Sequence, residues 1–134
     1  MKRQEVLTAL VIEDDPDMRE FITRVLGLDG YRVLQAEDVD TGLKLARENR
    51  VCLIVLDLRL PKLDGWHFLE WRGKEPLLLA IPTVVFTASA GVTQREKALC
   101  MGATEYLVKP LSADQLKSSI DRIMQGRRCG NHER

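Results

Sequence analysis

Apolar residues along the chain gather in five short runs, and their pattern predicts five strands. These runs cover residues 7–12, 31–36, 51–56, 83–86 and 106–108. The run at 51–56, VCLIVL, contains no charged residue, which is typical of a strand that is buried on both faces of a sheet. The run at 31–36 carries Arg32 and Gln35, so we expect an edge strand there.

The segments between these runs have the periodicity of helices. After Pro16, apolar residues at positions 18, 21, 22, 25 and 26 form one helical face. Two further helices are predicted at residues 38–49 and 66–71. A fourth is predicted to end at Gly102 and a fifth to follow Ser112, with an inward-facing stripe made of Leu116, Ile120 and Ile123.

Several residues indicate where these helices begin. Asp15 is a plausible N-cap for the first helix, since Pro16 suits the first helical position. The pairs Thr93 and Glu96, and Ser112 and Gln115, have the spacing of a capping box. Residues 77–81 lie between two prolines and are predicted to be a connector.

The alternation of strands and helices predicts an α/β fold. We expect a doubly wound, five-stranded parallel sheet of the flavodoxin-like order 2-1-3-4-5, with five helices covering its two faces. In this order the first and third strands are neighbours. The carboxyl ends of all five strands then lie at the same edge of the sheet, where ligands bind in open α/β sheets.

Length and charge place limits on the kind of protein. The 134 residues fit one domain, predicted at 1–126 with a polar tail at 127–134. Twenty basic residues balance twenty acidic ones, so the bulk charge does not favour direct contact with nucleic acid. No apolar run approaches the roughly 18 residues of a membrane span, and the N-terminus lacks the pattern of a signal peptide. We therefore expect a cytoplasmic protein that does not contact membranes.

Polar residues stand where the predicted strands end. Glu13, Asp14 and Asp15 follow the first strand, and Asp57 follows the third, before a loop that contains Pro61 and the turn Asp64-Gly65. Thr87 ends the fourth strand and Lys109 the fifth. The predicted strand order brings these side chains together at one edge of the sheet.

This set of side chains indicates phosphoryl transfer. Clustered carboxylates repel and raise one another's pKa values, and a hard divalent cation such as Mg²⁺ relieves that repulsion. Lys109 adds a positive charge and Thr87 a hydroxyl, both of which can contact phosphoryl oxygens. Catalysis of phosphoryl transfer is mainly positioning and charge neutralisation, and a carboxylate such as Asp57 can be the nucleophile.

Four motifs together resemble the receiver domain of response regulators in two-component signalling. They are VIEDDPDMR at 11–19, VLDLRLPKLDG at 55–65, VVFTA at 84–88 and YLVKPL at 106–111, and the resemblance covers about residues 7–124. It implies a phosphorylatable switch, not a conventional enzyme, that catalyses its own phosphorylation and dephosphorylation. The phosphoryl donor would be the phospho-histidine of a histidine kinase or phosphotransfer protein.

The resemblance also assigns roles to individual residues. Asp57 would be the phosphoacceptor, and Thr87 and Lys109 would contact the phosphoryl group. Mg²⁺, or Mn²⁺ in its place, would bind Glu13, Asp14, Asp57 and the backbone carbonyl of Arg59. The Lys109–Pro110 bond would be cis. Tyr106 would turn inward together with Thr87 on phosphorylation, and the face of the fourth helix, fifth strand and fifth helix would bind a downstream protein.

Other interpretations of the same residues remain open. Asp15 is equally well explained as a helix cap, and Tyr106 as a half-buried aromatic residue of a strand. A haloacid-dehalogenase-like phosphatase also forms an aspartyl-phosphate, but it needs a second aspartate at the position of Arg59. A flavin or nucleotide binder of similar topology would need a Gly- or Ser/Thr-rich loop where Glu-Asp-Asp-Pro stands.

Three positions bear on how this receiver-like chain would behave. Arg59 and Ser89 lie where receivers flank the water that hydrolyses the acyl phosphate, and Arg59 has no acceptor to orient that water. We expect it to prolong the phosphorylated state. Ser119 stands where dimerising receivers usually have an arginine, which weakens the expectation of that dimer. The initial methionine and the tail favour a stand-alone receiver.

Overall fold

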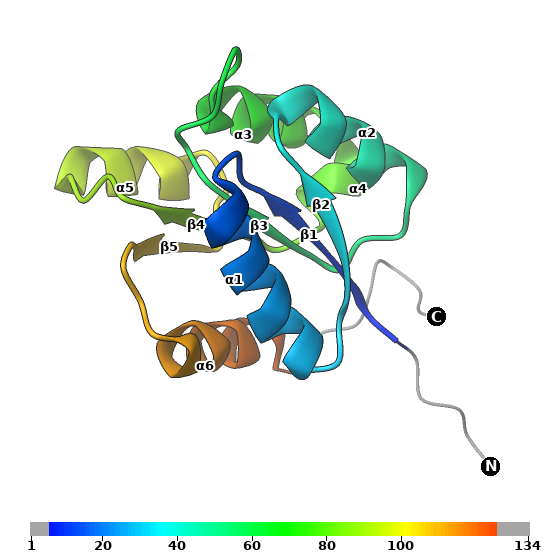
Figure 1. Cartoon of the computed structure of the whole chain (residues 1–134). Coiled ribbons are helices and arrows are strands. Elements are labelled where there is room, and N and C mark those ends of the chain that lie inside the picture. Colours follow the sequence, from blue (N-terminus) through cyan, green and yellow to red (C-terminus); the bar gives the residue numbers. More distant parts are fainter. Residues whose placement is uncertain (1–5, 126–134) are drawn as a thin grey trace.

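Five parallel strands form the centre of the molecule in the order β2-β1-β3-β4-β5 (Figure 1). The structure is a computed structural model, and it describes residues 6–125. The strands are β1 (Thr8–Ile12), β2 (Arg32–Ala36), β3 (Leu53–Leu56), β4 (Thr83–Thr87) and β5 (Glu105–Val108). The predicted sheet order, the parallel directions and the edge position of β2 are confirmed.

The described residues contain six helices rather than the five predicted. They are α1 (Pro16–Leu28), α2 (Val39–Glu48), α3 (Gly65–Lys74), α4 (Pro76–Leu79), α5 (Val92–Cys100) and α6 (Ala113–Met124). The additional helix, α4, lies where a connector is predicted. Pro76 occupies its first turn, where a fixed φ suits a helix, and burial of Leu78 holds the turn against the core.

The capping predictions have different outcomes. Asp15 caps α1, and Ser112 and Gln115 form a reciprocal capping box at α6, as predicted. The capping box predicted for Thr93 and Glu96 is wrong. The N-cap of α5 is Gly91, which has no capping side chain, and the helix begins at Val92, so that Thr93 already lies in the first turn.

Two helical layers cover the two faces of the sheet (Figure 1). Alternate residues of β1 point to opposite layers, as the period of a strand requires. Ala9 and Val11 pack with residues of α1 and α6, whereas Leu10 and Ile12 pack with residues of α2, α3, α4 and α5. No helix within residues 6–125 is long and apolar enough to cross a membrane. The predicted tail at 127–134 lies outside the described residues.

A charged side chain, Arg72 of α3, is part of this core. It is only 3% exposed, and its Nη2 donates to the carbonyl oxygens of Leu79 at 3.1 Å and Ile81 at 2.8 Å. Gly102 packs against the guanidinium: a Cβ built there would lie 2.8 Å from Nη1 of Arg72, and its φ of +105° also favours glycine. Arg72 thus joins α3 to the end of α4 and to the segment before β4.

Candidate functional site

The polar residues at the strand ends continue the hydrogen-bonding pattern of the sheet. The Glu13 N–H donates to Ala36 O, and the Asp57 N–H donates to Ile12 O, both at 3.0 Å. The Lys109 N–H donates to Thr87 O at 2.8 Å. The backbones of these residues are therefore held by neighbouring strands, and their side chains emerge at the carboxyl edge of the sheet, as predicted.

The loop after Asp57 is shaped by a close approach of two backbones. A Cβ built at Gly65 would lie 2.5 Å from Asp57 O and 2.7 Å from Leu58 Cα, so a side chain there would force the loop to move. The Gly65 N–H donates to Leu58 O at 2.9 Å, and Asp64 caps α3 by accepting from the Trp66 N–H. The turn Asp64-Gly65 thus folds the start of α3 back onto the residues beside Asp57.

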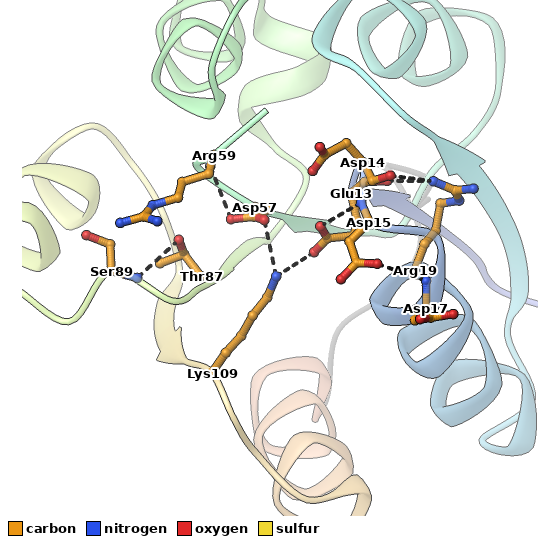
Figure 2. Close-up of polar contacts among 10 residues, drawn as sticks. All are labelled: Glu13, Asp14, Asp15, Asp17, Arg19, Asp57, Arg59, Thr87, Ser89 and Lys109. Atoms are coloured by element: carbon orange, nitrogen blue, oxygen red, sulfur yellow. Dashed lines mark hydrogen bonds and ion pairs between the residues drawn. The ribbon is translucent and has the colours of Figure 1, made fainter. Parts of the chain in front are cut away.

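Lys109 links the buried carboxylates that follow β1 and β3. Its Nζ donates to Glu13 Oε1 at 2.7 Å and to Asp57 Oδ2 at 3.1 Å (Figure 2). The second oxygen of Asp57, Oδ1, accepts from the Arg59 N–H at 3.1 Å. The side chains of Glu13 and Asp57 are 2% and 7% exposed, so this ion-pair network is largely shielded from solvent.

The network leaves Glu13 with an unusual protonation equilibrium. Burial raises the pKa of Glu13 to about 7, and although the hydrogen bond from Lys109 opposes this shift, the negative charge of Asp57 adds to it. Burial alone would lower the pKa of Lys109, but its bonds to Glu13 and its attraction to Asp57 outweigh burial and raise that pKa. One lysine does not fully offset two buried carboxylates, so the site favours an additional positive charge.

The carboxylates are close enough to share a cation. Glu13, Asp14 and Asp57 each offer an oxygen, and these oxygens lie within 4.8 Å of one another. Asp14 is exposed, whereas the other two are buried, so a cation could enter from the side of Asp14. A set of carboxylate oxygens fits Mg²⁺, which commonly combines one or two carboxylates with waters and phosphate oxygens.

A polar cleft of about 540 Å³ lies beside these carboxylates. Asp14, Arg59 and Ser89 are among its lining residues, and the Arg59 side chain is exposed. In Figure 2, Arg59, Thr87 and Ser89 lie on one side of Asp57, and Glu13 and Asp14 on the other. A phosphoryl group that approached Asp57 through this cleft would have the carboxylates of Glu13 and Asp14 on one side and the hydroxyls of Thr87 and Ser89 on the other.

Asp15 has the capping role that the sequence left open. Its side chain accepts from the Asp17 N–H at 3.1 Å, and Asp15 is not part of the described carboxylate cluster. Its backbone N–H donates to Glu13 Oε2 at 3.2 Å. Asp15 therefore supports the site through the start of α1 and through its backbone.

Tyr106 lies inward in this structure and contacts the loop after β4. The ring is already inward, with only 3% of the residue exposed, and its hydroxyl donates to Ser89 O at 2.6 Å. Thr87 is fully buried, and its Oγ1 accepts from the Ser89 N–H at 3.4 Å. The loop after β4 thus provides an acceptor for the inward ring, and the movement of Tyr106 on phosphorylation stays a prediction. The Lys109–Pro110 bond has the cis form that the resemblance implies.

Arg19 also contacts the loop that carries Glu13, a role that the sequence did not predict. It belongs to the motif VIEDDPDMR, but no role is predicted for it. In the structure its Nη1 donates to Glu13 O at 2.9 Å. The available signal was its position one helical turn after the N-cap Asp15, from which a long side chain can reach back to the acidic loop.

Comparison with known proteins gives the family. The family model described as the response regulator receiver domain matches residues 9–121. The phosphate regulon transcriptional regulatory protein PhoB of Escherichia coli is 34% identical over 116 residues, which are 87% of this chain and 51% of that protein. The chain thus spans about half the length of the curated relatives it matches.

Solved structures agree with this match. The non-phosphorylated HemR receiver domain from Leptospira biflexa is 31% identical with a TM-score of 0.83, over 95% of this chain and 99% of that one. The receiver domain of the sensor histidine kinase PA1611 from Pseudomonas aeruginosa, with a magnesium ion coordinated in its active site cleft, is 29% identical with a TM-score of 0.81, over 90% and 98%. By fold, motifs and sequence, this chain belongs to the response regulator receiver domain family.

Proposed function

We propose that this protein is a signalling switch that accepts a phosphoryl group on Asp57 from the phospho-histidine of a histidine kinase or phosphotransfer protein. The observation that carries the proposal is that Asp57 shares a carboxylate cluster with Glu13 and Asp14 and is paired with Lys109, next to a polar cleft lined by Asp14 and Leu58. The reaction is a displacement in which a carboxylate oxygen of Asp57 bonds to phosphorus while the phosphorus–nitrogen bond of the donor breaks.

Each residue around Asp57 has a defined task in this reaction. The Arg59 N–H and the Lys109 ammonium hold the two oxygens of Asp57 and thereby orient the nucleophile. Lys109 and the hydroxyl of Thr87 are the donors for the oxygens of the transferred group. Glu13, Asp14, Asp57 and the carbonyl of Arg59 would hold Mg²⁺ or Mn²⁺, which supplies positive charge against the phosphoryl oxygens.

The same contacts suggest how phosphorylation reaches the surface. Ser89 is bonded to Thr87 through its N–H and to Tyr106 through its carbonyl, so the loop between β4 and α5 joins the site to β5. A phosphoryl group that draws in Thr87 and Lys109 would shift this loop. We propose that the face of α5, β5 and α6, the predicted fourth helix, fifth strand and fifth helix, changes its affinity for a downstream protein, since a switch works only through such differential binding.

The setting of this switch is also a proposal. We infer that the domain works in the cytoplasm, where its donor would be found, and contacts neither membranes nor nucleic acid directly. Relatives such as PhoB are named as transcriptional regulators, and the match to this chain covers about half of their length. Binding of DNA in such a system would then fall to another domain or to the downstream partner.

The decisive experiment is labelling by a small phosphodonor. With Mg²⁺, the protein should gain one phosphoryl group, detected by intact mass and mapped to Asp57. Asp57→Asn should abolish labelling, and Asp114→Asn, an exposed aspartate in the first turn of α6, should leave it unchanged. Labelling that survives Asp57→Asn, or that proceeds equally well in chelator, would overturn the proposal.

A further inference from the structure

Arg19 joins three segments next to the carboxylate cluster. It lies in α1, and its Nη1 donates to the carbonyl oxygens of Glu13 at 2.9 Å and Asp14 at 3.4 Å. Its Nε donates to Gln35 Oε1 on β2 at 3.3 Å. Figure 2 shows the guanidinium beside the loop on the side away from Lys109. One side chain therefore ties the loop after β1 both to a helix and to the edge strand.

This tie acts where the sheet stops supporting the loop. The β1–β2 pairing ends at Ile12 and Ala36, and the Glu13 N–H makes the last backbone bond to β2. Beyond it, the Asp14 carboxylate has no hydrogen-bonding or ion-pair partner within residues 6–125. The direction in which Asp14 presents its oxygens thus depends on its backbone, and Arg19 holds that backbone by the carbonyls of the two peptide groups that flank Asp14.

We propose that Arg19 is a positioning residue for the cation site. By fixing the carbonyls of Glu13 and Asp14, it orients the two carboxylates of the loop after β1 toward Asp57 before a divalent cation binds. The inference rests on the proposed function only in requiring that this cluster binds a divalent cation. It assigns Arg19 no contact with the cation or with the transferred phosphoryl group.

Two effects of Arg19 on cation binding have opposite signs. Its positive charge repels a divalent cation, so removing it would tighten binding if charge dominated. Its hydrogen bonds hold the ligand-bearing loop in place, so removing them would weaken binding if positioning dominated. Groups that orient metal ligands typically contribute about tenfold or more to metal affinity, whereas repulsion from a partly exposed charge is screened by solvent and salt. Positioning should therefore dominate.

The test measures cation affinity directly. The dissociation constant of Mn²⁺ is obtained from the paramagnetic resonance signal of the free ion, and that of Mg²⁺ from competition. Arg19→Met should weaken binding about tenfold. Arg19→Lys should weaken it nearly as much, because an ammonium keeps the charge but loses the planar fork that reaches two carbonyls and Gln35 at once.

Arg24→Met is the matched control. Arg24 lies on the same helix, and its side chain is 74% exposed and paired with Glu20, so this substitution removes the same unit charge without touching the loop. It should change Mn²⁺ affinity by less than about twofold. Gln35→Leu should weaken binding about threefold on its own, within the range of coupled hydrogen bonds, and add little to Arg19→Met.

The Mg²⁺ dependence of the labelling rate distinguishes a positioning role of Arg19 from a loss of folded protein. Labelling of Arg19→Met at Asp57 should need more Mg²⁺ but reach the wild-type rate at saturation, and thermal unfolding in chelator identifies loss of fold. If the methionine variant unfolds, the lysine and Gln35→Leu variants carry the same test. Wild-type affinity in Arg19→Met and Arg19→Lys, or tighter binding, would overturn the inference while leaving the proposed function intact. Failure of wild-type protein to bind Mn²⁺ would overturn both.

Discussion

Lys109 and Arg72 are both shielded cations, but they lie at opposite edges of the sheet and have opposite kinds of partners. Lys109 follows β5 at the carboxyl edge and bonds to two carboxylates. Arg72 lies near the amino end of β4 and bonds only to the neutral carbonyls of Leu79 and Ile81. Within the described residues, Nε and Nη1 of Arg72 have no acceptor, and burial lowers its pKa.

The difference separates an exchangeable charge from a structural one. The partners of Lys109 are anions that could also bind a metal cation, so its bonds can be exchanged when ligands arrive. The partners of Arg72 are backbone carbonyls far from the site. The guanidinium donates to the carbonyl at the end of α4 and packs against Gly102. Both residues donate to buried polar groups, but only Lys109 does so at a site where a bound cation or phosphoryl group would change the net charge.

The first prediction concerns the structural cation and has the largest expected effect. Arg72→Ala should lower the free energy of unfolding by about 4 kcal/mol, because it opens a cavity and removes the Arg72 donor from the carbonyls of Leu79 and Ile81, of which Ile81 O keeps only the Thr83 hydroxyl. Urea unfolding measures this loss. Saturating Mg²⁺ should not reduce the difference from wild type.

Arg95→Ala, on the exposed surface of α5, is the control for Arg72 and should cost less than about 0.5 kcal/mol. If Mg²⁺ restored the stability that Arg72→Ala loses, Arg72 would not differ from Lys109 in the way proposed.

The second prediction concerns the anionic side of the Lys109 network. The pKa of Glu13 is about 7 in the native protein against an ordinary 4.5, so the folded state holds this proton more tightly than the unfolded chain. Between those two values, the contribution of Glu13 therefore makes the free energy of unfolding fall as pH rises, by roughly 3 kcal/mol in total. Glu13→Gln should abolish this fall.

Urea unfolding at pH 4 and pH 8, in chelator, measures the effect of Glu13 as a difference between wild type and variant. Glu70→Gln, on the exposed side of α3, should leave the wild-type pH dependence unchanged. Parallel curves for wild type and Glu13→Gln would contradict the prediction.

The third prediction tests the exchangeable cation. Lys109→Ala should lower the free energy of unfolding by about 2 kcal/mol in chelator, since two buried carboxylates lose their counterion. Mg²⁺ should stabilise this variant more than wild type. The variant should accept phosphate but respond weakly, as measured by amide exchange in α5 with and without beryllofluoride.

Lys117→Ala is the matched control for Lys109, because Lys117 also bridges two carboxylates, Asp29 at 3.5 Å and Asp121 at 2.7 Å, but on the surface away from the cluster. Its effect on stability should be small and independent of Mg²⁺. A full exchange response in Lys109→Ala would show that Lys109 does not transmit the switch.

The smallest expected effect concerns Arg59, whose backbone N–H is bonded to Asp57. Its side chain lines the cleft and has donors but no acceptor with which to orient a hydrolytic water. The phosphorylated form should therefore last about tenfold longer than in Arg59→Asn, a difference of about 1.4 kcal/mol in barrier. Dephosphorylation rates at saturating Mg²⁺ and equal salt measure this, and equal rates or a slower variant would show that Arg59 does not protect the acyl phosphate.

Local sequence signals account for the elements that were predicted correctly. The uninterrupted run at 51–56, the proline at position 16 and the Ser112–Gln115 pair act through neighbours in the chain, so each can be recognised without a fold. The errors arose where a local signal competed with packing. Burial of Leu78 holds α4 where prolines indicated a connector, and α5 begins at Val92 after the N-cap Gly91, although Thr93 and Glu96 have capping-box spacing.

The sequence by itself determined the alternation of strands and helices, and hence which polar residues end which strands, because periodicity and turn chemistry are local properties. Only the tertiary structure decided the electrostatics of those residues. Lys109 meets Glu13 across 96 positions of sequence, and the burial that raises the pKa of Glu13 comes from segments that the chain brings together only on folding. The bonds from Arg19 to backbone carbonyls and the inward Tyr106 were likewise decided by packing, since their partners are main-chain atoms that every residue has and that no sequence motif distinguishes.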